Sequence, residues 1–113
     1  MAIYPSYDLA PPMAVGGECT YLADFSAALA AMIAVYGTAL TIASFTVALA
    51  PTSPQTGLVI VGSTLNATST GVLLRLSASA AANYVLTVTP TLSNPTADVD
   101  PRTILVPVLV SLG

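Results

Sequence analysis

The longest stretch without a charged side chain runs from Phe25 to Leu74, which is 50 of the 113 residues of this chain. The whole chain has five acidic residues, two arginines and no lysine. A soluble domain usually carries charges on about a quarter or more of its surface residues. A lone monomer with so few ionic groups would depend on Ser, Thr, Asn and backbone groups for solubility, and we expect it to self-associate. The sequence therefore predicts a surface that is covered by protein or by lipid.

The chain also lacks most side chains that carry out chemistry. It contains no His and no Trp, and its single cysteine is Cys19. General acid–base and nucleophilic mechanisms usually rely on such groups. The one close carboxylate pair, Asp98 and Asp100, precedes Pro101 and is typical of a turn, and a metal site needs more ligands. We therefore predict that the protein is not an enzyme, binds no metal and needs no cofactor, and that Cys19 is a buried apolar residue.

The net charge of −3 argues against nucleic acid as a partner. Phosphate binding relies on clustered Arg and Lys side chains that displace counterions, whereas Arg75 and Arg102 are isolated in the sequence. If the protein belongs to a particle that contains a genome, we expect it to face other proteins or solvent.

One segment is long enough to cross a bilayer as a helix. Leu29–Ala50 has 22 uncharged residues. Gly37 interrupts it, however, and no Lys or Arg cluster flanks it to orient a membrane helix. The pattern also changes, because residues 27–34 are alanine-rich whereas residues 40–49 are rich in β-branched and aromatic side chains. A small membrane protein, such as a holin-like or anchoring subunit, is therefore an alternative to a soluble β fold.

Residues 1–22 are interrupted by prolines and glycines and are predicted to form an extended N-terminal arm, followed by one domain over 23–113. The arm contains Ile3, Tyr4 and Tyr7, whereas a disordered tail usually has few aromatic residues. We expect these three side chains to anchor the arm on a neighbouring subunit, because tyrosines give a large contact area at small entropic cost.

Most of the domain is predicted to be β structure. Residues 21–34 are compatible with one short helix that has Asp24 near its start. The apolar positions are even over 40–42 and odd over 45–49, which indicates a bulge around Ala43 and Ser44. Residues 58–61 have the length of a short strand.

The second half alternates more regularly. Apolar residues of one parity recur over 72–76, 84–88 and 104–110, which predicts three antiparallel strands of a sandwich or barrel. Pro107 places the last strand at a sheet edge, where Leu105 and Leu109 could receive a neighbouring chain. Tyr84 is either a corner tyrosine, with its hydroxyl bonded to the backbone, or a simple cross-strand aromatic residue.

The order of these segments resembles the small immunoglobulin-like domains that are common in tailed bacteriophages. The resemblance covers about residues 24 to 110 and rests on Asp24-Phe25-Ser26-Ala27-Ala28-Leu29, on residues 40–47, 71–77 and 83–89, and on the Asp- and Arg-containing turn 98–103 that leads into 104–108. It implies a mainly β, immunoglobulin-like antiparallel β-sandwich. No binding residue can be carried over from the family, because the turns before Tyr84 and at Arg102 differ from the family's glycine-containing turns.

The resemblance and the composition together predict a virion structural protein. We expect a capsid decoration or cement subunit, assembled in the host cytoplasm, that stabilises the particle through its arm and its apolar surface. Its partners would be the major capsid protein, other virion subunits or copies of itself, and Arg102 is expected to join Leu105 and Leu109 in the interface. A tail- or neck-associated subunit and a carbohydrate-binding module are alternatives; the latter class favours exposed aromatic residues.

Overall fold

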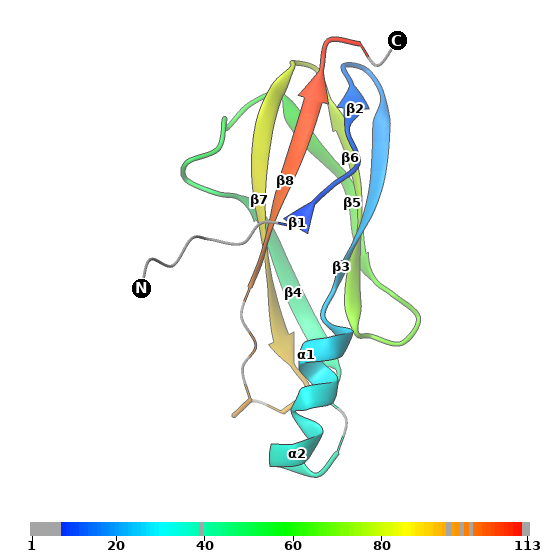
Figure 1. The fold of residues 1–113 in the computed structure, drawn as a ribbon, viewed down its shortest axis with the longest axis vertical. Helices are drawn as coiled ribbons and strands as arrows, with labels where there is room; N and C mark the ends of the chain where they lie inside the picture. The colour runs from blue at the N-terminus through cyan, green and yellow to red at the C-terminus, as the bar shows by residue number, and fades with distance from the viewer. Residues whose placement is uncertain (1–7, 39, 95, 98, 100, 112–113) are drawn as a thin grey trace.

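The structure is a computed structural model that describes residues 8–38, 40–94, 96–97, 99 and 101–111. The described residues form two β-sheets that pack face to face, with a short helical connection at one end (Figure 1). The prediction of a mainly β sandwich with a short helical segment is confirmed. The strands are β1 (Asp8–Leu9), β2 (Met13–Ala14), β3 (Glu18–Asp24), β4 (Ile42–Leu49), β5 (Leu58–Leu65), β6 (Gly71–Ala78), β7 (Ala82–Leu92) and β8 (Arg102–Leu109), and the helices are α1 (Ser26–Ala31) and α2 (Ile33–Tyr36).

The two sheets differ in how they are built. One has the order β3-β6-β5 and is antiparallel throughout. The other has the order β1-β8-β7-β4, in which β7 pairs antiparallel with both of its neighbours. β1 and β2 both pair in parallel with β8, one after the other along its length. The N-terminal segment therefore belongs to the sheet that contains the C-terminal strand.

The core lies between the sheets and follows from the alternation of the long strands. Side chains of one parity point inward, because successive residues of a strand face opposite sides. The fully buried inward residues include Val72, Leu74, Leu76, Leu86, Val88, Ile104 and Val106. Packing of branched aliphatic side chains thus holds the sheets together without a disulfide or a tryptophan.

Tyr84 closes one end of this core. Its ring is buried, and its hydroxyl donates a hydrogen bond to the carbonyl oxygen of Ala80 at 2.9 Å. Of the two alternatives, bonding to the backbone is therefore the one observed. Gly57 adjoins the hydroxyl at a φ of +102°, and a Cβ built there would collide with the Tyr84 hydroxyl. Only glycine satisfies both the backbone angle and the space.

The predicted bulge is confirmed. The pairing of β4 with β7 shifts register between Ile42 and Ser44, and it is then regular from Ser44 to Leu49. A second shift, between Ile60 and Gly62, interrupts the middle of β5. β5 also continues to Leu65, beyond the short run that was predicted.

The helical prediction was partly wrong. Residues 21–24 belong to β3, because they pair with β6, and the helices begin only at Ser26. The expected role of Asp24 is confirmed, since its carboxylate accepts a hydrogen bond from the Ser26 amide at 2.9 Å. Gly37 ends α2 at a φ of +76°. The alternative of one membrane-spanning helix over 29–50 is wrong, because these residues divide between helix and β4; none of the described helices could span a bilayer.

The arm prediction also needs correction for the residues that the structure describes. Residues 8–22 do not form one extended arm: a turn at residues 15–16 separates β2 from β3, and all three strands pair within this chain's own sheets, so the predicted boundary at residue 22 falls inside β3. The prediction that Pro107 marks a free edge was wrong for the same reason. β1 and β2 cover the outer side of β8, and Pro107 falls in the gap between them, beside Pro11 and Pro12. Both errors arise from pairing between residues far apart in the sequence, about 95 positions for β1 and β2 with β8 and about 50 positions for β3 with β6, which local patterns do not report.

Candidate interaction surfaces

The six predicted interface residues fall into two groups. Ile3, Tyr4 and Tyr7 lie outside the described residues. The other three, Arg102, Leu105 and Leu109, all lie on β8. The described part of the prediction therefore concerns the surface around this one strand.

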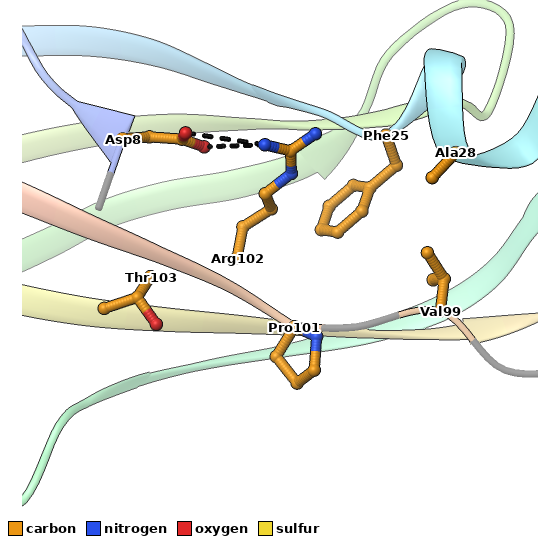
Figure 2. Close-up of a pocket in the computed structure, with 7 residues that line it drawn as sticks. All are labelled: Asp8, Phe25, Ala28, Val99, Pro101, Arg102 and Thr103. Carbon is orange, nitrogen blue, oxygen red and sulfur yellow. Dashed lines mark hydrogen bonds and ion pairs between the residues drawn. The ribbon is translucent and has the colours of Figure 1, made fainter. Parts of the chain in front are cut away.

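Arg102 contacts the N-terminal segment of its own chain. Its guanidinium lies 3.4 Å from the Asp8 carboxylate and 5.7 Å from the centre of the Phe25 ring (Figure 2). Both side chains of the ion pair are about one-third exposed. Arg102 therefore joins β8 to β1 and to the start of the helical connection, an arrangement in which both charge and ring contact contribute.

Two shallow pockets flank this ion pair. One of about 330 Å³ is lined by the ring of Phe25, by Thr103 and by Val99 and Pro101 of the preceding loop (Figure 2). The other, of about 270 Å³, is lined by Tyr21 and Leu22 of β3 and by Asp24, Ser26 and Ala27. Both pockets are lined by Asp8, whose carboxylate is paired with the Arg102 guanidinium. Among the described residues, no three acidic or Cys side chains converge as metal ligands would, and Asp98 and Asp100 lie outside those residues.

The pKa shifts of the titratable groups near these pockets are caused by burial and by local contacts within the fold. Burial, and then the negative charge of Asp8, raise the pKa of Tyr21. Hydrogen bonds from Ser26 lower the pKa of Asp24. Burial raises the pKa of Cys19, whose Sγ lies 3.8 Å from the carbonyl oxygen of Pro11. A thiol with a raised pKa is a poor nucleophile, which agrees with the expected apolar role of this buried residue.

Leu105 and Leu109 lie on the outer face of their sheet. Leu105 stands in register with Leu9 on one side and Val85 on the other. Leu109 pairs with Ala14 and is 45% exposed. The predicted residues thus form part of an apolar outer surface, although no strand can add beside them because β1 and β2 occupy that side.

Sequence reasoning missed a different surface, which we call the open flank. It runs along β4 and β5, the outermost strands of the two sheets on the side away from β1 and β3. Inward-facing apolar residues there are only partly buried; they are Phe45, Val47, Leu49, Leu58, Ile60 and Leu65. No charged residue occurs on either strand. The 50-residue uncharged run was the signal for this surface, but it could not show which edge the run would occupy.

The opposite side, which we call the closed flank, contains β1, β2 and β8 with β3 beside them. All the charged residues that the structure describes lie on its strands or on the neighbouring β6; they are Asp8, Glu18, Asp24, Arg75 and Arg102. None of the described charges therefore lies on β4 or β5, and Arg75 is the one on a strand next to the open flank. The helical connection adds a further uncharged area: α2 lies at its outer end (Figure 1), and Ile33 and Val35 of α2 are exposed.

Comparison of the chain with family models, with curated proteins and with solved structures finds no match. The functional argument therefore depends on the surfaces described above.

Proposed function

We propose that this protein is a structural subunit of a virion, of the capsid decoration or cement type, which stabilises a particle by packing between other subunits. The single observation that carries the proposal is the open flank: two uncharged edge strands with an incompletely buried apolar seam between them. An exposed edge strand invites pairing with another chain, and natural monomers usually protect such edges with charges, prolines or covering segments. β4 and β5 have neither charges nor prolines.

The fold supports the class of protein that the sequence resembles. Two features support an immunoglobulin-like form of the sandwich: the strand orders β3-β6-β5 and β8-β7-β4, and the Tyr84 hydroxyl bonded to a backbone carbonyl four residues upstream. Fold alone does not define function, so the resemblance to bacteriophage domains contributes to the proposal only alongside the surface.

The chemistry of the surface points to protein partners. Neutral edges and apolar patches recognise other apolar surfaces and strand edges, whereas nucleic acid would require clustered cations. In this proposal the partners are the major capsid protein, other virion subunits and further copies of this chain. Many weak contacts repeated around a particle would give strong overall attachment.

The test is sedimentation of assembled particles from the source that encodes this chain. We expect the protein to migrate with intact particles through a density gradient, at a copy number comparable with that of the major subunit or a simple fraction of it. A washed, nuclease-treated sample controls for trapped protein and for nucleic acid. If the chain remains at the top of the gradient in every preparation, the virion proposal is wrong.

A further inference from the structure

On the open flank, the sheet that ends with β4 has room for one more strand beside β4. Phe45, Val47 and Leu49 face inward from β4, since they pair with buried positions of β7, yet each remains partly exposed. Among the residues that the structure describes, β4 has a neighbouring strand on one side only, so this flank has no covering strand there. A strand added to the free side of β4 would cover this seam and would also pair the unused backbone groups of the edge.

The closed flank shows how this protein covers such a seam. Residues 8–14 run beside β8, and the Ala10 amide donates a hydrogen bond to the Leu105 carbonyl at 2.9 Å. Ala10 and Met13 enter the core and are 1% and 2% exposed. A short extended segment that contains two prolines is therefore enough to close one flank.

We propose that residues 1–7 of a second copy add as a strand to β4, along Ser44–Leu49, and close the open flank. This inference depends on the proposed function, because it names the contact by which copies of the subunit join. β4 is the acceptor rather than β5, because the pairing of β4 is regular from Ser44 to Leu49, whereas β5 is interrupted between Ile60 and Gly62.

The sequence of residues 1–7 fits such a strand. Its odd positions, Met1, Ile3, Pro5 and Tyr7, are apolar and could share the inward side, as alternate residues of a strand do. The even positions are Ala2, Tyr4 and Ser6. Pro5 is compatible with an outermost strand, because one side of that strand needs no hydrogen-bond donor. The segment has no charged side chain, and neither has β4.

The donor must be a neighbouring copy. In the order β1-β8-β7-β4, the free side of β4 lies four strand spacings of about 4.8 Å from β1. Crossing about 19 Å at about 3.3 Å per residue uses about six of residues 1–7 of the same chain, so too few of them remain to line Ser44–Leu49. Because the donated segment and the accepting edge are different surfaces, each copy can give to one neighbour and receive from another, which produces rings or chains.

Disulfide trapping tests the contact directly. One chain carries Ser6→Cys, and its partner carries Thr46→Cys or Ala48→Cys, all with Cys19→Ala to remove the native thiol. Thr89→Cys is the matched control, because Thr89 stands in register with Thr46, is exposed on the same sheet and lies one strand in from the edge. A disulfide requires Cα atoms within about 7 Å. We expect the better β4 pair to link two copies at least tenfold faster than the Thr89 pair; equal rates would overturn the proposal.

Sedimentation of purified protein gives a second readout. We expect the full chain to associate with rising concentration, and deletion of residues 2–7 to weaken association at least tenfold. Thr46→Lys should weaken it similarly, because a charge at the edge opposes strand addition, whereas Thr89→Lys should not. Circular dichroism confirms that each variant is folded. A full chain that stays monomeric, or a deletion that associates equally well, would refute the arm contact. Neither result would affect co-sedimentation with particles, which tests the virion proposal separately.

Discussion

The two flanks of the sandwich differ in whether this chain covers the outer edge of their sheets. On the closed flank, β1 and β2 cover β8, and two side chains of this segment complete the core. On the open flank, β4 and β5 have no covering segment among the described residues, and their inward side chains remain partly exposed. This difference is the basis of our proposal that the open flank is completed by association, since an exposed edge strand invites pairing with another chain.

The largest expected loss of stability comes from truncating a closed-flank side chain that is buried in the core. Met13→Ala should cost about 2–5 kcal/mol of unfolding free energy, because it removes a buried side chain and leaves a cavity. Val47→Ala on the open flank removes partly exposed atoms and should cost the monomer about 1 kcal/mol. Urea unfolding of both variants at low protein concentration measures the difference. Equal losses would mean that the flanks do not differ in packing.

The next effect concerns the connection that joins the two open-flank strands. Gly57→Ala should destabilise the fold by about 1–3 kcal/mol, because a side chain is strained at this positive φ and would displace the Tyr84 hydroxyl. Gly62→Ala is the matched control within β5, since a Cβ there meets no atom within 4 Å and its φ is not positive. Thermal unfolding compares the two. If Gly57→Ala unfolds no earlier than Gly62→Ala, the corner at Tyr84 does not position this connection.

The sequence predicted the features that depend on neighbouring residues and missed those that depend on pairing between residues far apart in the chain. Alternation within one strand predicted β6, β7 and most of β8, and the change of parity located the bulge of β4, because both signals are local. The pairing of residues 8–14 with β8 is a contact between the two ends of the chain, and no local pattern reports it. Residues 21–24 were assigned to a helix for the same reason, since only β6 makes them a strand. The uncharged run predicted a covered surface but not the edge where it lies.

Two ion pairs allow a finer comparison, because both lie away from the open flank but in different surroundings. Asp8–Arg102 joins β1 to β8 with about two-thirds of each side chain shielded, whereas Glu18–Arg75 lies on the outer face of the other sheet with more than half of each exposed. Double-mutant cycles with Asp8→Asn and Arg102→Gln should give a coupling of about 0.5–1 kcal/mol, and the cycle at Glu18 and Arg75 a smaller value. Added salt should reduce both couplings. A stronger coupling at the more exposed pair would contradict the assigned role of Arg102 in holding the closed flank.

The smallest effect is a pH dependence at the end of β3, where the closed flank meets α1. Hydrogen bonds from Ser26 lower the pKa of Asp24, so the folded state favours the carboxylate more than the unfolded chain does. The resulting stabilisation is fully present above the unfolded pKa of about 3.9 and is lost as the pH falls through the lower folded value. Asp24 is largely exposed, so the contribution should be about 0.5 kcal/mol or less.

Comparison with Asp24→Asn isolates this contribution, because Asn keeps a side-chain oxygen that can accept the Ser26 amide but does not titrate. We expect the difference in unfolding free energy between the native chain and Asp24→Asn to be constant from pH 5 to 7 and to shrink below about pH 4. Asp24→Ala should be less stable than Asp24→Asn at every pH, since it lacks the acceptor altogether. If the native chain instead gained stability relative to Asp24→Asn on acidification, the carboxylate would be unfavourable in the fold, and the junction between β3 and α1 would have to be held by the Phe25 packing alone.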